Sequence, residues 1–184
     1  FHVLRRQMRR EWRAPLIIMT PKSLLRSPRA TSRPADLASG RFQRVLDDPA
    51  VTQRPETVRR VLLCSGKVYY DALEHFEKLG EEKGLARDSI ALVRVEQLYP
   101  WPAVELAQTV QRYENAEDVY WLQEEPSNMG AWTFVHPRLE DLLRTVPRLG
   151  YAGRRASAAP SGGSMRLHRE RQARLLDAAV AGPV

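Results

Sequence analysis

The chain has 184 residues and is 43% apolar, enough to bury one full core, with either part of a second unit or a set of extended arms in addition. Its longest apolar runs are far shorter than the roughly 20 residues that a membrane-crossing helix needs, so we expect no membrane partner. The net charge of +7 is uneven: residues 1–60 hold 14 Lys/Arg against 5 Asp/Glu, residues 61–147 hold 8 against 15, and residues 148–184 hold 7 against 2. An acidic middle between basic flanks argues against a uniformly basic nucleic-acid binder, so we expect no nucleic-acid partner either.

The first 26 residues have the pattern of a helix followed by a strand. Leu4, Met8 and Trp12 are spaced as the buried stripe of a surface helix over residues 2–12. The run LIIMT after Pro15 predicts a short buried strand. We therefore expect residues 1–26 to be the tail of an α/β domain. Because the chain starts without Met and has no secretory signal pattern, we expect a fragment or a processed product.

Residues 27–57 are rich in Pro, Ser, Arg and Asp and show little periodicity, which predicts an interdomain connector. A short helix is expected within it near residues 34–38.

Residues 58–184 repeat a strand–helix pattern and should form one domain. Such alternation predicts mostly parallel strands joined by right-handed crossovers, with helices on both faces of the sheet. The strands are expected at residues 58–65, 89–95, 118–124 and 148–153. A first helix is expected over residues 67–84, ending at Gly84, and a second after Pro102. A third is expected from its apolar positions, with Pro137 starting or kinking it, and a fourth should follow Ser164 as its cap. The apolar positions of the third helix are Val135, Leu139, Leu142, Leu143 and Val146.

Two glutamates end the strand predicted at 118–124. Glu124 and Glu125 precede Pro126 and a turn, SNMGAW, that leads into a helix. Carboxyl ends of strands are where open α/β sheets place ligand sites. We predict that these glutamates order the following loop, either by bonding to local amides or by holding a partner's backbone.

Basic side chains follow the first predicted strand, and one lies in the strand at 89–95. Lys22, Arg26 and Arg94 are the candidates for a phosphate or carboxylate ligand, because guanidinium groups make paired contacts to such anions. The alternative is that these residues bridge two domains by pairing with the acidic middle.

Other chemistry-bearing residues give weaker signals. Cys64 lies in the apolar run VLLCSG and is expected to be a buried hydrophobe. The four histidines are scattered, and no Walker loop, GxGxxG or Cys/His metal cluster occurs. We assign no catalytic, cofactor-binding or metal-binding residue to this chain.

Three strings in combination, TPKSLLRSP at 20–28, LCSGKVYYD at 63–71 and QEEPSNMGAW at 123–132, resemble the decarboxylating component of 2-oxoglutarate dehydrogenases. FHVLRRQ, VRVEQLYPWP and YAGRRASAAPSGG extend the resemblance over most of the chain. It implies a transketolase C-terminal-like α/β domain at 58–184, preceded by the last helix and strand of a pyrimidine-binding-type domain.

The resemblance also implies an activity and partners. The whole enzyme would be a homodimer that oxidatively decarboxylates 2-oxoglutarate in the tricarboxylic acid cycle and passes the succinyl group to a lipoyl arm of dihydrolipoyl succinyltransferase. Thiamine diphosphate and Mg²⁺ would bind in the upstream domains, so this segment alone is expected to be inactive. Its roles would be structural and dimerising, with acetyl-CoA or an adenine nucleotide as candidate regulators. We expect a bacterial cytoplasmic location, or the mitochondrial matrix if the source is eukaryotic.

Two further interpretations stay open at this point. The chain could be a stand-alone regulatory module for CoA or nucleotide, or a basic interaction protein unrelated to catalysis. The first predicts salt-sensitive binding of acetyl-CoA, and the second predicts binding to generic polyanions.

Overall fold

The computed structural model describes residues 1–84, 87–144 and 148–181 and divides the chain into two compact units, Phe1–Gln43 and Arg44–Val184. None of the helices in these described ranges combines the length and the apolar character needed to cross a membrane. The predicted domain boundaries after residues 26 and 57 stay a prediction. In the structure, the boundary between the two compact units falls after Gln43.

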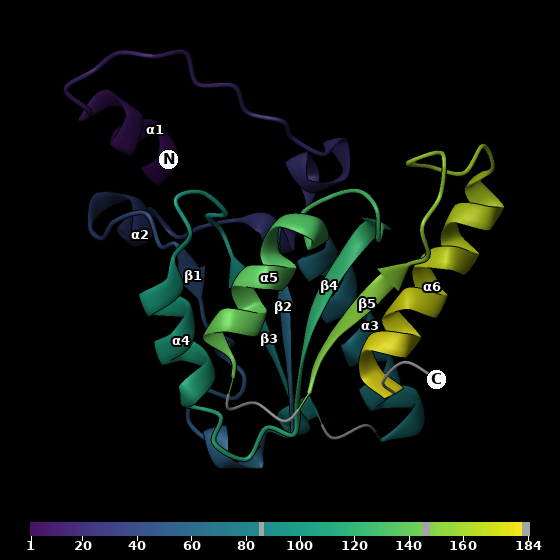
Figure 1. The fold of residues 1–184 in the computed structure, drawn as a ribbon. Helices are drawn as coiled ribbons and strands as arrows, with labels where there is room; N and C mark the ends of the chain where they lie inside the picture. The colour runs from purple at the N-terminus through teal and green to yellow at the C-terminus, as the bar shows by residue number, and fades with distance from the viewer. Residues whose placement is uncertain (85–86, 145–147, 182–184) are drawn as a thin grey trace. The chain divides into compact units, whose positions relative to one another are not determined.

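The first unit consists of short helices joined by extended chain (Figure 1). The expected helix near residue 34 is present: Pro34 occupies its first position, and the Asp36 carboxylate accepts a hydrogen bond from the Arg33 backbone N–H at 3.0 Å. The elements are α1 (His2–Met8), the 3-10 helices η1 (Lys22–Arg26) and η2 (Pro28–Ala30), and α2 (Pro34–Ala38).

Two predictions for this unit are wrong. The first helix ends at Met8 and buries no side chain, so the predicted stripe is exposed. The LIIMT run forms no strand, and Ile17 and Met19 are 82% and 89% exposed. The reason is that a strand needs a neighbour for its backbone hydrogen bonds, and no strand in the described residues pairs with this run.

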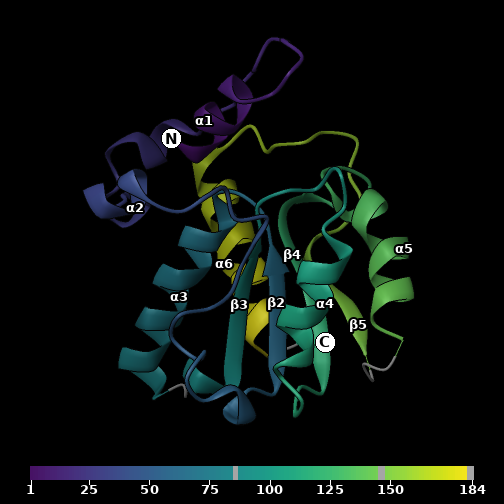
Figure 2. The ribbon, with the colours of Figure 1, turned by 90° about the vertical axis from the view of Figure 1, so that its left-hand side faces the viewer.

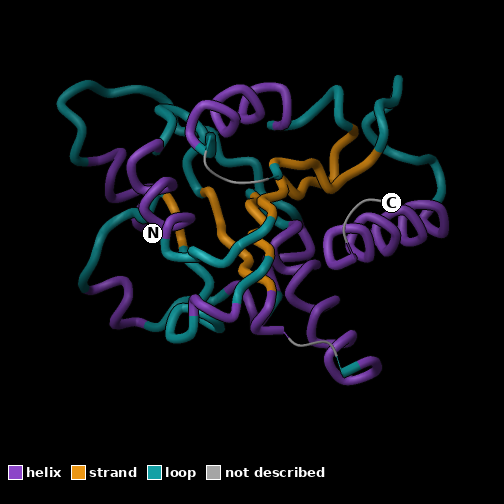
Figure 3. The backbone as a smooth tube through the Cα atoms, turned by 60° about the horizontal axis from the view of Figure 1, so that its bottom comes forward, coloured by secondary structure: helices purple, strands orange, loops and turns teal. Residues whose placement is uncertain are grey.

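The second unit is a five-stranded sheet between two layers of helices (Figures 2 and 3). The strand order is β1-β3-β2-β4-β5; β2 to β5 are parallel and β1 is antiparallel to β3. The predicted α/β fold with a mostly parallel sheet is therefore confirmed. The strands are β1 (Val45–Leu46), β2 (Arg60–Cys64), β3 (Ile90–Val95), β4 (Asp118–Pro126) and β5 (Leu149–Arg154). The helices are α3 (Val68–Lys83), α4 (Ala103–Gln111), α5 (Trp132–Leu142) and α6 (Met165–Ala181), with 3-10 turns η3 (Pro55–Thr57) and η4 (Arg87–Ser89).

Alternating side chains divide the core between the two faces of the sheet. In β2, Val61 and Leu63 join the core that α4 and α5 cover, whereas Leu62 and Cys64 join the core that α3 and α6 cover. Both faces of a central parallel strand are thus apolar, which is why β2 appears in the sequence as a continuous apolar run. Cys64 is fully buried, as expected, and burial raises the pKa of its thiol to about 12.

In the sheet unit, the helix ends follow the sequence signals with one exception. Gly84 ends α3 in the left-handed conformation at φ 63°, and the Ser164 carbonyl accepts the first backbone bond of α6 from His168. The exception is α5, which begins at Trp132, so Pro137 lies inside the helix rather than at its start, and the predicted kink at Pro137 stays a prediction. Val146, which the apolar spacing predicts for this helix, lies outside the described residues.

Part of the predicted connector belongs to the sheet unit. Asp48 is only 2% exposed; its carboxylate accepts the Leu92 backbone N–H at 2.7 Å and pairs with Arg87. A buried carboxylate with several donors anchors residues 45–52 to β3.

Candidate functional site

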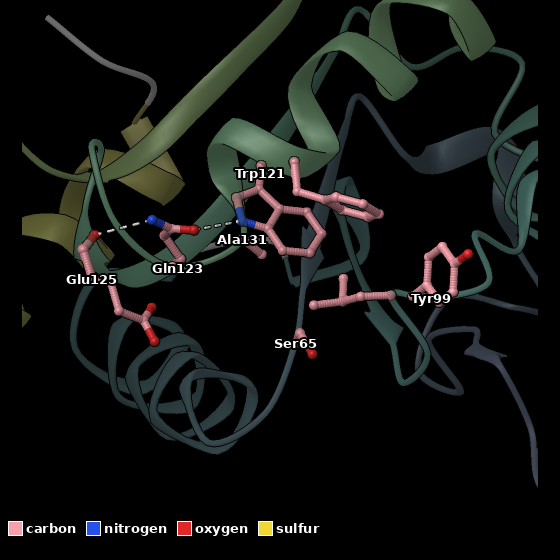
Figure 4. Close-up of a pocket in the computed structure, with 9 residues that line it drawn as sticks. Ser65, Tyr99, Trp121, Gln123, Glu125 and Ala131 are labelled. Carbon is pink, nitrogen blue, oxygen red and sulfur yellow. Dashed lines mark hydrogen bonds between the residues drawn. The ribbon is translucent and has the colours of Figure 1, made fainter.

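The candidate site is a pocket of about 470 Å³ at the carboxyl ends of β2 and β4, where α/β sheets commonly place ligands (Figure 4). Its apolar wall comes from β4, from the start of α5 and from the segment after β3, and Gln123 and Glu125 add polar groups. The lining residues are Ser65, Leu98, Tyr99, Trp121, Gln123, Glu125, Gly130, Ala131 and Phe134.

Gln123 holds the floor of this pocket together. Its Oε1 accepts hydrogen bonds from the Trp121 indole N–H at 2.9 Å and from the Trp132 backbone N–H at 3.0 Å. Its Nε2 donates to the Met129 carbonyl at 2.8 Å and to the Glu125 and Pro126 carbonyls, both at 3.2 Å. With only 4% of its surface exposed, this amide therefore ties the β4 end, the loop 126–131 and the first residue of α5 into one rigid unit.

Gly130 allows the loop to close over that amide. It has φ 66°, a conformation that side chains other than glycine's rarely adopt. A Cβ there would lie 3.0 Å from Gln123 Nε2 and 3.0 Å from Glu125 Cβ. Glycine is needed both for the backbone conformation and for the close approach.

The structure places Glu124 and Glu125 differently from each other. The Glu124 carboxylate forms an ion pair with Lys67 at 3.2 Å. Glu125 contributes its main-chain carbonyl, which accepts from Gln123 and, at 2.9 Å, from the Tyr151 hydroxyl, while its carboxylate points away from Gln123 (Figure 4). The side chain seen to bond the loop amide is that of Gln123, so a loop-ordering role for the two glutamates stays a prediction.

Lys67 lies between two acids at the start of α3. It pairs with Asp71 and Glu124, and Asp71 also accepts from Gln172 of α6 at 2.9 Å. Burial works to lower the pKa of Lys67, but Asp71 and Glu124 outweigh it and raise that pKa above its ordinary value. Lys67 is thus a charged structural link between α3 and β4 at neutral pH.

The three predicted regulator residues lie in different units. Lys22 and Arg26 share the single turn η1 in the first unit, and Arg94 lies in β3 of the second. The Arg94 guanidinium bonds Glu96 at 2.7 Å and lies 4.6 Å from the Tyr69 ring centre. Burial opposes the charge of Arg94, but Glu96 raises its pKa. Their ligand-binding role stays a prediction.

The described residues bring no three His, Cys, Asp or Glu side chains together in a group that could hold a metal ion. Mg²⁺ needs several oxygen ligands, so this donor set does not fit a metal-bound diphosphate.

Comparison with known proteins gives consistent matches. Residues 31–180 match the family described as 2-oxoglutarate dehydrogenase C-terminal. The chain is 45% identical over 181 residues to the 2-oxoglutarate dehydrogenase E1 component of Cupriavidus necator and 48% identical over 193 residues to that of Brucella ovis. Each match covers 98% of this chain and 18% of the relative, so the chain spans less than a fifth of these relatives' length.

Among solved structures, a chain of a split-gene transketolase, an inactive beta4 tetramer, is similar with a TM-score of 0.51 at 20% identity. The similarity covers 77% of this chain and 43% of that chain. At this identity the match supports the fold alone, and it agrees with the predicted transketolase-like architecture.

Proposed function

Because this chain belongs to the 2-oxoglutarate dehydrogenase C-terminal family, we propose that it is the C-terminal segment of a thiamine diphosphate-dependent 2-oxoglutarate dehydrogenase. The observation that carries the proposal is 45–48% identity over 98% of the chain to E1 components of that enzyme. The whole protein would decarboxylate 2-oxoglutarate in the tricarboxylic acid cycle and pass the succinyl group to the lipoyl group of dihydrolipoyl succinyltransferase. Thiamine diphosphate and Mg²⁺ would bind outside this segment.

We propose a structural and dimerising role for the segment itself. The loop around Gln123 supports this role, because five hydrogen bonds of the Gln123 side chain fix the loop at the carboxyl end of β4. A fixed edge of this kind suits a surface against which upstream domains of the same chain or the homodimer partner pack. A bacterial cytoplasmic location, or the mitochondrial matrix if the source is eukaryotic, is part of the proposal.

We also propose that Lys22, Arg26 and Arg94 bind acetyl-CoA or an adenine nucleotide as a regulator. Calorimetric titration of the chain with acetyl-CoA tests this idea. Saturable binding that weakens with added salt and is lost on Arg26→Ala would support it, and no heat with the unmodified chain would remove it.

The main proposal is tested by assaying 2-oxoglutarate decarboxylation with thiamine diphosphate and Mg²⁺. The 184-residue chain is compared with the same chain extended upstream to the natural start of its gene. Activity only in the extended protein would support the proposal. Activity in the 184-residue chain alone would contradict the expectation that the cofactors bind upstream.

A further inference from the structure

A second groove, of about 840 Å³, lies between the segment that follows β5 and helix α6. Four of its lining residues are arginines and none is acidic, whereas its other lining residues are mostly small. The lining residues are Pro126, Gly153, Arg154, Arg155, Ala156, Ser157, Ala159, Pro160, Arg171, Arg174, Leu175 and Ala178.

The loop side of the groove is fixed in place. The Asn128 side chain donates to the Ser157 carbonyl and accepts from the Ser157 backbone N–H, both at 3.0 Å. Tyr151 donates to the Arg154 carbonyl at 3.1 Å. These bonds hold the loop that carries Arg155 against the end of β4.

The helix side is fixed by the core. Leu175, Leu176 and Ala179 are buried against β4 and β5, which sets the orientation of α6. Arg171 and Arg174 are three residues apart and therefore lie on one helix face. A Cβ at Gly162 would lie 3.5 Å from Arg171 Nη1, so this guanidinium lies beside the segment that precedes α6.

Among the described residues, no acidic side chain pairs with the arginines of the groove. Arg154 is held by Gln172, which accepts from its Nη2 at 3.3 Å, and by His168, whose Nδ1 lies 3.2 Å away. Its Nε is buried and has no hydrogen-bond partner within residues 1–84, 87–144 and 148–181. In the described part of the chain, Arg155, Arg171 and Arg174 make no ion pair. Four like charges around one groove repel one another, and an anion would relieve this repulsion.

We propose that this arginine groove binds a small multivalent oxyanion carrying clustered phosphate or carboxylate oxygens. The guanidinium fork matches both groups through paired hydrogen bonds. The groove volume is within the range of small-molecule sites, roughly 300–1,000 Å³, and the small side chains at Gly153, Ala156 and Ala178 leave room beside the charges. A concave, fixed site of this size favours a small anion over an extended acidic polypeptide.

Calorimetric titration of the 184-residue chain at low salt tests the proposal with two probes. Inorganic pyrophosphate represents phosphate ligands, and tricarballylate represents carboxylate ligands. The test variant is Arg171→Ala/Arg174→Ala. The matched control is Arg169→Ala, which removes an exposed arginine of the same helix that does not line the groove. A second variant, Arg155→Ala, probes the loop side independently of the helix.

We expect saturable binding of at least one probe with a dissociation constant below about 1 mM. The double variant should weaken it by about tenfold or more, because each charge-assisted contact is strong. Arg155→Ala should also weaken it, and Arg169→Ala should change it less than about twofold. The probe with the lower dissociation constant identifies the ligand class as phosphate or carboxylate.

Three outcomes would overturn the proposal. The first is no saturable binding of either probe. The second is equal binding by the unmodified chain, the double variant and Arg155→Ala. The third is binding of a polyglutamate peptide without binding of either small anion, which would assign the groove to a protein partner.

Discussion

Arg60 of β2 forms a two-pronged ion pair with Asp118 of β4: Nε lies 2.7 Å from Oδ1 and Nη2 lies 2.8 Å from Oδ2. The third nitrogen of the same guanidinium, Nη1, donates to the carbonyls of Ala179 and Val180 at 3.2 and 2.7 Å. One side chain thus joins two strands to the C-terminal turn of α6. The side chains of the pair are only 16% and 12% exposed.

Replacing Arg60 with Met should strongly destabilise the sheet unit. The change leaves the Asp118 carboxylate in its buried position without its partner, and a broken buried pair typically costs about 3–5 kcal/mol. Urea unfolding followed by circular dichroism measures the free energy of unfolding. Arg144→Ala is the control, because its pair with Asp141 is more than three-quarters exposed on both sides and should contribute little. Equal losses in the two variants would contradict this assignment.

Gln123→Ala should loosen the loop that follows β4. Its removal takes this partner from the buried Trp121 indole N–H, the Trp132 backbone N–H and the Met129 carbonyl, at a cost of roughly 1–3 kcal/mol for each group left unsatisfied. Hydrogen exchange should show faster exchange of the Trp132 backbone amide, which donates to Gln123. The control Gln108→Ala changes an exposed glutamine on α4 and should leave this exchange rate unchanged. Unaltered exchange in Gln123→Ala would refute the role given to this amide.

Gly150→Ala should be destabilising because of crowding in β5. A Cβ at this position would lie 2.1 Å from Cε1 of the buried Tyr120 ring. Overpacking of this kind costs about 1–3 kcal/mol. Gly163→Ala is the comparison, since its Cβ would meet nothing within 4 Å. Thermal unfolding of the two variants should differ clearly; a Gly150→Ala chain as stable as Gly163→Ala would show that the ring can move aside without cost.

The stability of the sheet unit should fall at alkaline pH partly through Tyr151. Burial raises the pKa of Tyr151 to about 12 from 10.0. Because the folded pKa is above the unfolded one, the contribution is fully present below pH 10 and is lost as pH rises from 10 towards 12. Tyr151→Phe should therefore unfold with a shallower pH dependence over this window, measured by urea titration at several pH values. Parallel curves for the two proteins would contradict the raised pKa.

Most of the sheet unit could be predicted from the sequence, because apolar runs and helix-end residues are both local signals. Continuous apolar runs marked β2, β3 and β4, and residues such as Gly84 and Ser164 marked helix ends. The same reasoning failed for LIIMT, because an apolar run becomes a strand only when a neighbouring strand supplies its backbone hydrogen bonds. Such pairing depends on residues distant in sequence.

For the candidate site, the sequence predicts the location but not the side chain that orders the loop. The sequence indicates the carboxyl end of β4, and its charged residues Glu124 and Glu125 are more conspicuous there than Gln123. A polar residue two positions after the buried Trp121, on the same side of the strand, was a usable signal, because a buried polar group must find partners. Its five partners depend on how the loop 126–131 returns, which no local pattern specifies. The arginine groove likewise requires two segments that meet only in the fold.

The most direct test of the central claim is substrate choice by the protein extended upstream to its natural start. Release of labelled carbon dioxide would be measured from 2-oxoglutarate and from pyruvate, each with thiamine diphosphate and Mg²⁺. We predict release from 2-oxoglutarate that needs the cofactors and exceeds release from pyruvate. No cofactor-dependent release from 2-oxoglutarate, or preference for pyruvate, would contradict the assignment to a 2-oxoglutarate dehydrogenase.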